Sequence, residues 1–194
     1  MAAERDDAFR EAIRRYQSPM MAVAMSLVGD KLADEVVQEA WLSALRAIGS
    51  FEQRSSLKTW LLRIVANEGK TRLRRENRQT SLDAMLEADP YFRERFDSTG
   101  HWTAAPEAWE ADTPEALLTR DELQHCIEQT MMQLPGFQQA ALNLRERQGM
   151  SMKEICNILE VSESNVRVLL HRARMRVFRT IEHFETTGEC QPGE

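Results

Sequence analysis

The sequence lacks several features that would assign it to common classes of protein. No apolar stretch approaches the ~20 residues that a membrane-spanning helix needs, and the first residues do not have the charged-then-apolar order of a secretory signal. No Asn-Gly or Asp-Gly dipeptide marks a tight hairpin, and no long run alternates β-branched with polar residues. We therefore expect an all-α protein that is cytoplasmic and is not inserted into a membrane.

Cysteine is also scarce. Cys126, Cys156 and Cys190 are odd in number and widely spaced, which predicts no disulfide framework. Cys126 and Cys156 lie on apolar faces of expected helices and are interpreted as core residues, whereas Cys190 lies in a polar tail as a candidate free thiol. No C-x-x-C or H-x-x-x-H pair indicates a zinc site, and no nucleophile–base pair or Gly-rich phosphate loop indicates catalysis. We expect no metal, no cofactor and no enzyme activity.

Negative charge is concentrated in one part of the chain. The net charge of the full chain is −6, which argues against nucleic-acid binding only if the charge is spread evenly along the sequence. Residues 1–78 contain 14 basic and 11 acidic residues, residues 79–119 contain 2 and 9, and residues 120–194 contain 9 and 11. Because affinity for phosphate depends on local clusters of charge, the acidic middle segment does not exclude DNA binding elsewhere.

Residues 151–176 have the clearest local pattern in the chain. Ser151 and Glu154 have the spacing of a capping box, so a helix is expected to begin there, and Ser162 is a suitable N-cap for a second helix. Five arginines without an intervening acid follow within thirteen positions: Arg167, Arg172, Arg174, Arg176 and Arg179. Two short helices and a tight turn, the second helix cationic, are typical of a helix-turn-helix that enters the major groove. The turn has Glu160-Val161 instead of the commoner glycine, and a solvated helix pair is the alternative.

The N-terminal part predicts amphipathic helices. Residues 4–28 are expected to form two helices that separate at Ser18-Pro19, and Asp30 is expected to cap the next one. The apolar stripe of that helix repeats at three and four residues: Ala33, Val36, Val37, Ala40, Trp41, Ala44, Leu45 and Ile48. Its other face has Asp34, Glu35, Gln38 and Glu39, which suits either plain solvation or docking of a basic partner.

A basic stripe follows on the helix expected from Leu57 to about Arg78. Its members are spaced by three or four residues and so share one face: Arg63, Asn67, Lys70, Arg74 and Arg78. Such a stripe is suited to a nucleic-acid backbone, and Phe51 and Trp60 beside it are suited to stacking on unpaired bases. A basic helix with buried aromatics is the alternative.

The remaining segments differ in pattern. Residues 79–119 combine three prolines and nine acids with scattered aromatics, which predicts a linker that lies along a surface or inside a partner's channel. Asp121 is expected to open the last domain, with one helix that stops at Pro135-Gly136 and another that ends at Gly149. The tail from residue 187 is expected to be disordered.

Three stretches, in this order, resemble the extracytoplasmic-function group of bacterial RNA polymerase sigma factors. They are ADEVVQEAWLSAL (33–45), FEQRSSLKTWLLRIVANEGKTRLRR (51–75) and the block 134–174 that ends in VSESNVRVLLHRAR. The resemblance implies two small helical domains: region two in residues 1–78, and a region-four helix-turn-helix in residues 120–186, joined by the acidic linker. The sequence departs from the family pattern in two places: Leu57 replaces a usual aromatic, and Gln53-Arg54 replaces a common glycine or acid.

The resemblance implies a role for each matching residue. The clamp of the largest polymerase subunit would be contacted by Asp34, Glu35, Gln38 and Glu39. An unstacked base of the minus-ten element would be captured by the loop 51–56 and the start of the next helix, through Phe51, Ser55, Lys58 and Trp60. The non-template strand would be held by Arg63, Asn67, Lys70 and Arg74. The minus-thirty-five element would be contacted by Ser164, Asn165, Arg167, Val168, His171, Arg172 and Arg174.

The sequence thus predicts a non-catalytic transcription initiation factor. Its expected partners are core RNA polymerase (clamp and the flap of the second-largest subunit), promoter DNA and an anti-sigma factor. A stand-alone dimeric regulator would leave the acidic helix and the stripe on 63–78 without a role, and a decoy that titrates an anti-sigma factor would need no basic clusters. We expect Arg63, Lys70 and Arg74 to lie within reach of a DNA strand. Whether the two domains close on each other in the free protein is not decided by the residues.

Overall fold

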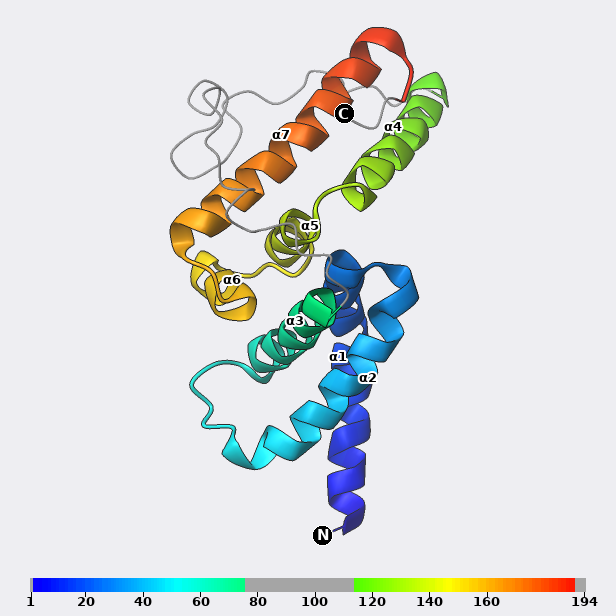
Figure 1. Cartoon of the computed structure of the whole chain (residues 1–194). Helices are drawn as coiled ribbons and strands as arrows, with labels where there is room; N and C mark the ends of the chain where they lie inside the picture. Colours follow the sequence, from blue (N-terminus) through cyan, green and yellow to red (C-terminus); the bar gives the residue numbers. More distant parts are fainter. Residues whose placement is uncertain (1, 76–113, 191–194) are drawn as a thin grey trace.

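The computed structural model describes residues 2–75 and 114–190, and these residues form helices and connecting turns without a strand (Figure 1). We call residues 2–75 the first lobe and residues 114–190 the second lobe. The first lobe contains α1 (Ala2–Val28), α2 (Asp30–Ala47), the short 3₁₀-helix η1 (Ile48–Ser50) and α3 (Leu57–Arg75). The second contains α4 (Pro114–Met132), α5 (Gly136–Leu142), the π-helix η4 (Asn143–Arg147), α6 (Met152–Leu159) and α7 (Glu163–Thr187). The all-α prediction is confirmed; the residues 79–113 of the expected linker lie outside the described residues.

The helix α1 is continuous, which corrects the prediction of two helices separated at Ser18-Pro19. Pro19 lies inside it, although an interior proline removes one backbone hydrogen bond and costs about 3 kcal/mol. Most of the residues that follow in α1 are completely or almost completely buried, including Met20, Val23 and Leu27. Packing of this half against α2, α3 and α5 therefore outweighs the local preference of proline for a helix start.

The helix α2 buries a narrower stripe than the sequence predicts. The predicted positions from Ala33 to Ala44 are buried, but Leu45 and Ile48 are about half exposed, so their assignment to the core is wrong. Leu45 follows Asp34 by 11 residues, close to three helical turns, and therefore lies on the acidic side of the helix. Asp30 is the first residue of α2 and the N-cap is Gly29, with a positive φ of 78° that suits glycine.

The helix-turn-helix forms as predicted. Ser151 and Glu154 make both bonds of the capping box at the start of α6, and the Ser162 hydroxyl accepts a hydrogen bond from the Asn165 backbone N–H at the start of α7. Before it, the chain from Asn143 to Arg147 adopts the wider π-helical turn. The helix α4 begins at Pro114, earlier than the predicted opening at Asp121.

Cys126 and Cys190 form a disulfide, which contradicts the prediction that Cys190 is a free thiol. Cys126 is fully buried on α4, and α4 packs against α7. Gly188, with a φ of 70°, ends α7 in the left-handed conformation and turns the chain back, so that Cys190 reaches α4. Residues 187–190 thus belong to the described structure; residues 191–194 lie outside it.

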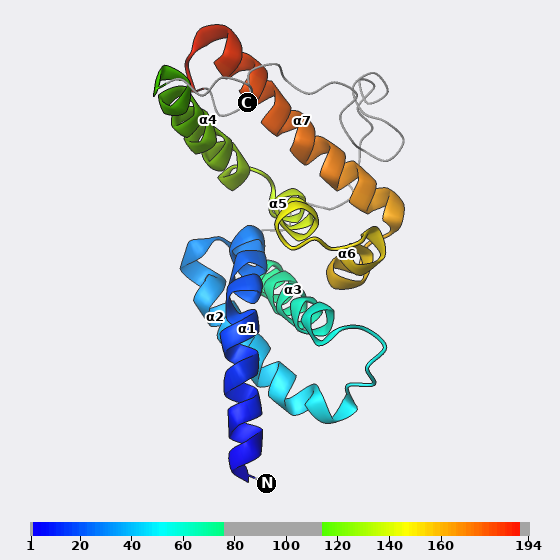
Figure 2. The same ribbon diagram turned by 180° about the vertical axis from the view of Figure 1, so that it is seen from behind.

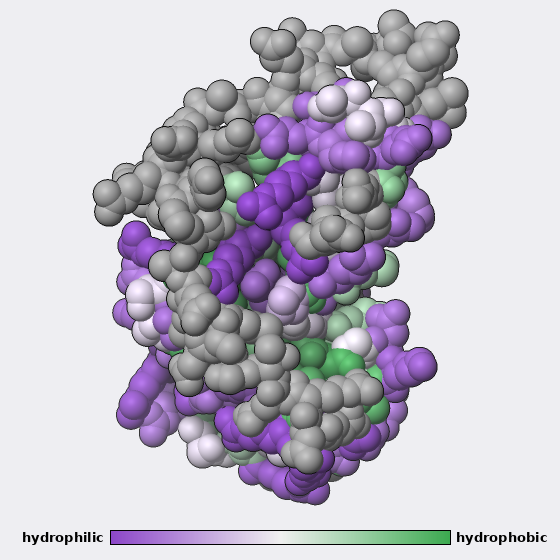
Figure 3. Space-filling view, turned by 45° about the horizontal axis from the view of Figure 1, so that its top comes forward, coloured by the Kyte–Doolittle hydropathy of each residue, from purple (hydrophilic) through white to green (hydrophobic). Residues whose placement is uncertain are grey.

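The two lobes lie against each other along two helix pairs, α1 with α5 and α3 with α6 (Figures 1 and 2). Most buried apolar residues of both lobes belong to a single hydrophobic cluster. At the first pair the backbones approach closely, because a Cβ on Gly136 would lie 3.0 Å from the carbonyl oxygens of Ser26 and Leu27. The face shown in Figure 3 is largely hydrophilic, with small apolar patches.

Candidate nucleic-acid interface

The start of α3 carries the candidate base-capturing residues. Ser56 accepts a hydrogen bond from the Thr59 backbone N–H at 3.0 Å, the bond expected of an N-cap, and so fixes where the helix begins. The rings of Phe51 and Trp60 lie 5.0 Å apart, centroid to centroid, and both are half-buried. Gln53 between them has a φ of 56°, which is uncommon for a residue with a Cβ. The loop 51–56 is therefore held at both ends by contacts of its own.

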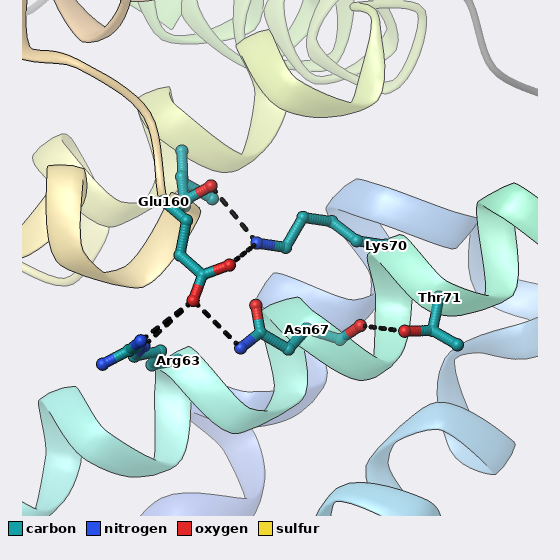
Figure 4. A network of polar contacts seen from close by, with 6 residues as sticks. Arg63, Asn67, Lys70, Thr71 and Glu160 are labelled. Atoms are coloured by element: carbon teal, nitrogen blue, oxygen red, sulfur yellow. Dashed lines mark hydrogen bonds and ion pairs between the residues drawn. The ribbon is translucent and has the colours of Figure 1, made fainter.

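The basic stripe of α3 faces the second lobe. Arg63 donates to Glu160 Oε1 through Nη2 at 3.0 Å and through Nε at 3.2 Å, and Lys70 Nζ lies 2.8 Å from Glu160 Oε2 (Figure 4). Asn67 Nδ2 donates to Glu160 Oε1 at 3.3 Å, and Lys70 also donates to the Leu159 carbonyl at 3.4 Å. We call Arg63, Asn67 and Lys70 the α3 cradle. It surrounds one carboxylate with two cations and an amide.

These contacts alter the expected accessibility of the stripe. The Lys70 side chain is only 12% exposed and Arg63 is 53% exposed, whereas Arg74 is exposed to solvent. The second lobe therefore largely covers Lys70, whereas Arg63 and Arg74 stay accessible to solvent, and contact of these residues with DNA stays a prediction. The cause is the closed arrangement of the lobes, which the residues alone left undecided.

Another candidate on α3, Lys58, and its neighbour Thr59 also contact the second lobe. Lys58 Nζ donates to the Gln148 carbonyl at 3.3 Å. Its neighbour Thr59 donates through Oγ1 to Glu154 Oε1 at 3.0 Å. In this conformation Lys58 and the α3 cradle are thus engaged by the turns before and after α6.

The α3 cradle strongly lowers the pKa of the carboxylate that it surrounds, that of Glu160. The hydrogen bond from Lys70, followed by those from Arg63 and Asn67, lowers the pKa of Glu160 from 4.5 to about 2, although partial burial acts in the opposite direction. The pKa of Glu154 is lowered mainly by its hydrogen bonds with Ser151 of the capping box. Both carboxylates are therefore ionised at neutral pH and contribute negative charge to the face that contacts α3.

On α7, most of the candidate DNA residues are accessible. Ser164 and Arg167 are exposed, and Asn165, Val168 and Arg172 are half-buried. Arg167 forms an ion pair with Glu163 at 2.7 Å, within the same helix, and both side chains are 59% exposed. Such an exposed pair contributes little to stability and leaves Arg167 available to a ligand.

Two residues of α7 differ from the prediction. His171 is 8% exposed, so its expected outward orientation is wrong; the helix packs against α4, α5 and α6 and thus buries a wide stripe. The Arg174 side chain is 17% exposed and pairs with Glu146 of η4 at 2.7 Å.

The acidic face of α2 is exposed at all four predicted positions, Asp34, Glu35, Gln38 and Glu39. Glu35 accepts a hydrogen bond from Arg72 of α3 at 2.9 Å. Leu42 and Leu45, which are 45% and 46% exposed, extend the same side of the helix and were missed as surface residues. The position of Leu42 around the helix axis could have predicted its exposure. Leu42 follows Gln38 by four residues, so it lies on the acidic side of the helix and outside the buried stripe from Ala33 to Ala44.

Two family profiles match separate parts of the chain. The profile described as Sigma-70 region 2 matches residues 12–79, and the profile described as Sigma-70, region 4 matches residues 124–177. The RNA polymerase sigma-H factor of Pseudomonas aeruginosa is 30% identical over 176 residues, which cover 90% of this chain and 86% of that protein. The ECF RNA polymerase sigma-E factor of Escherichia coli is 31% identical over 175 residues, 90% of this chain and 87% of that protein.

A solved structure has the same fold. The sigma factor RpoE, in complex with the anti-sigma factor NepR from Bartonella quintana, aligns with a TM-score of 0.59 and 22% identity, over 90% of this chain and 97% of that chain. Within residues 2–75 and 114–190, no helix combines the length and the apolarity that crossing a membrane would require.

Proposed function

Because this chain belongs to the extracytoplasmic-function group of RNA polymerase sigma factors, and is thus a transcription initiation factor that directs the polymerase to promoters, we propose a division of labour among its surfaces. The face of α2 formed by Asp34, Glu35, Gln38 and Glu39 docks on the polymerase clamp, and Leu42 and Leu45 extend that face. The observation that supports this is that all six side chains are exposed although the lobes are closed.

The two DNA-contacting surfaces belong to different lobes in this proposal. On the first lobe, Phe51, Ser55, Lys58, Trp60, Arg74 and the α3 cradle bind the minus-ten element. On the second, Asn165, Arg167, Val168 and Arg172 contact base edges of the minus-thirty-five element, and Ser164 and Arg174 contact its phosphates. The buried His171 is left out. The Arg and Lys types suit both tasks, because guanidinium groups pair with base edges and with phosphates.

Binding energy alone performs the work, so we propose that the protein is not an enzyme. It acts in the cytoplasm, where the polymerase is, and an anti-sigma factor controls it. The boundaries proposed for its parts are residues 1–78 for region two, 79–119 for the linker and 120–186 for region four.

The direct experiment is run-off transcription with core polymerase and a promoter selected from random sequence by the reconstituted holoenzyme. We expect transcripts only when this protein is added. If no transcript forms, and the protein alone binds the selected DNA as tightly as it does in the presence of core polymerase, the result would instead favour a stand-alone regulator. At a base contacted by Arg172, Arg172→Ala is expected to cost about 1–3 kcal/mol of discrimination.

The docking surface is tested by the charge reversal Asp34→Lys. Because Asp34 is exposed, the substitution is expected to leave the helix folded, as measured by circular dichroism. Affinity for core polymerase should fall at least about tenfold, since like charges placed across an interface are costly. The matched control is Lys31→Glu, which changes an exposed charge one turn earlier in α2; if both variants bind the polymerase as the parent does, Asp34 is not part of the docking surface.

A further inference from the structure

The α3 cradle binds a carboxylate in the way that basic residues bind a phosphate. Both oxygens of Glu160 are engaged, one by Arg63 and Asn67 and the other by Lys70 (Figure 4). A nucleic-acid phosphate likewise presents two anionic oxygens, and guanidinium, ammonium and amide groups are the side-chain donors that bind it. Glu160 therefore occupies the position that a phosphate would take on this surface.

The backbone at Glu160 provides an independent observation. Glu160 ends α6 with φ 54° and ψ 46°, the left-handed conformation in which glycine is strongly favoured. A residue with a Cβ is strained there, and strained positions are associated with functional contacts. The strain is compensated by what the side chain does, and its contacts in this structure are those with the α3 cradle.

A second contact between the lobes depends on the absence of a side chain. Gly136 has no positive φ, so the turn itself does not require glycine. A Cβ at this position would lie 3.0 Å from two carbonyl oxygens of the α1 backbone, a contact so tight that one of the helices would have to shift. Glycine at 136 is thus explained by the closed contact of α5 with α1, and it lies on a different helix pair from Glu160.

We propose that the α3 cradle is a phosphate-binding site for the promoter strand, and that Glu160 fills it in the free protein, so that closure of the lobes and binding of DNA exclude each other. The inference rests on the proposed function, since it takes the DNA role of α3 from there. It adds an autoinhibitory contact within the chain: the turn of the helix-turn-helix acts as an internal competitor of DNA.

The closed state covers one surface and leaves another open. Lys58 and Lys70 are engaged by the second lobe, whereas the acidic face of α2 is exposed. Docking of α2 on the polymerase therefore needs no prior opening. In the closed state Asn67 Oδ1 is buried without a hydrogen-bond partner among the described residues, which is a cost to closure.

The test uses the full-length chain and two opening variants. Glu160→Gln removes the charge and keeps the side-chain shape, and Gly136→Leu separates α5 from α1 without altering any candidate DNA residue. Glu122→Gln is the control, because it removes the same charge from an exposed position on α4 of the same lobe. Circular dichroism verifies that each variant is folded, and small-angle X-ray scattering gives the radius of gyration.

DNA binding is measured by fluorescence anisotropy with a labelled single-stranded oligodeoxynucleotide of random sequence, at low ionic strength. We expect both opening variants to have a larger radius of gyration and an affinity about fivefold higher, the factor that loss of a competing surface ion-pair network would give. Glu122→Gln should change neither quantity. Adding Arg63→Ala to Glu160→Gln should abolish the gain, because the DNA then lacks the site that Glu160 vacated.

The failures are distinguishable. If Arg63→Ala weakens DNA binding while Glu160→Gln changes neither the radius of gyration nor the affinity, autoinhibition is refuted and the proposed DNA surface stands. If the opening variants expand but the affinity is unchanged, and Arg63→Ala has no effect on it, then α3 does not bind DNA, and the phosphate site and the proposed function of α3 both fail.

Discussion

Glu160 combines an unfavourable backbone with a favourable side-chain environment. Its left-handed conformation costs about 1–2 kcal/mol for a residue with a Cβ, whereas its carboxylate accepts hydrogen bonds from three side chains of α3. The sequence indicated that the turn lacks the usual glycine. It could not indicate the reason, because the residues that contact Glu160 are about 90 positions away in the chain and hydrophobic periodicity contains no information on such contacts.

The pKa of Glu160 gives a prediction at the scale of this residue. A pKa lowered from 4.5 to about 2 means that the carboxylate stabilises the closed state fully above pH 4.5 and loses that effect as the pH falls towards 2. Since the side chain is 42% exposed, solvent screens the interaction, and Glu160→Gln should cost about 1 kcal/mol of closure at neutral pH.

Carbon-13 NMR of the side-chain carboxyl group measures this titration directly. At about pH 3.5, where a glutamate of ordinary pKa is largely protonated, Glu160 should still be ionised in the parent chain. Gly136→Leu, which removes Glu160 from the cradle without changing it, should return its midpoint towards the ordinary value. An ordinary midpoint in the parent chain would contradict the observed network, whose titratable members around Glu160 are Arg63 and Lys70.

At the scale of the helices, periodicity predicted most elements and failed where packing decided. The buried stripe of α2, the capping box of α6 and the N-cap of α7 follow from residue spacing alone, because caps and stripes are local. Pro19 was misjudged because burial of the following turn outweighs its local preference, and Leu45 because the width of a buried stripe depends on which helices cover it. The burial of His171 has the same cause, since three helices pack on α7.

The link between α4 and α7 gives the prediction at this scale. The disulfide joins residues 64 positions apart, so it restricts the unfolded chain and should contribute about 4 kcal/mol to the free energy of unfolding of the second lobe. Cys190→Ser removes the bridge without a cavity, because Cys190 is exposed. In urea unfolding, we expect the free energy of unfolding of Cys190→Ser to be lower than that of the oxidised parent by this amount. Adding dithiothreitol to the variant should lower it no further.

The state of the thiols can be counted. The oxidised parent chain should have one thiol that reacts with Ellman's reagent after unfolding, Cys156, and the reduced chain should have three. The protein is proposed to act in the cytoplasm, which keeps thiols reduced. Formation of the Cys126–Cys190 disulfide there would therefore require an oxidant. If Cys190→Ser unfolds at the same urea concentration as the oxidised parent, the bridge does not stabilise the second lobe.

For the whole molecule, the sequence predicted two lobes but not their contact. Each lobe forms from local stripes, whereas the closed arrangement depends on Gly136 meeting the α1 backbone and on Glu160 meeting α3. Gly136 is not unusual after a proline, and Glu160, although it replaces the commoner glycine of such a turn, does not by its type indicate what it contacts. The DNA surface proposed on α3 therefore rests on residue type, whereas its partial burial by the second lobe depends on contacts between distant segments, which residue type does not predict.

The shared hydrophobic cluster predicts how the whole chain unfolds. Because buried residues of both lobes form one cluster, the lobes should stabilise each other, and urea should unfold the oxidised parent chain in a single transition. Gly136→Leu forces α5 away from α1 and should split this into two transitions, each with a smaller dependence on urea, since each exposes less surface. Circular dichroism follows the helices of both lobes in one experiment. Two transitions in the parent chain would show that the lobes are thermodynamically independent, and closure would then be too weak to keep DNA from α3.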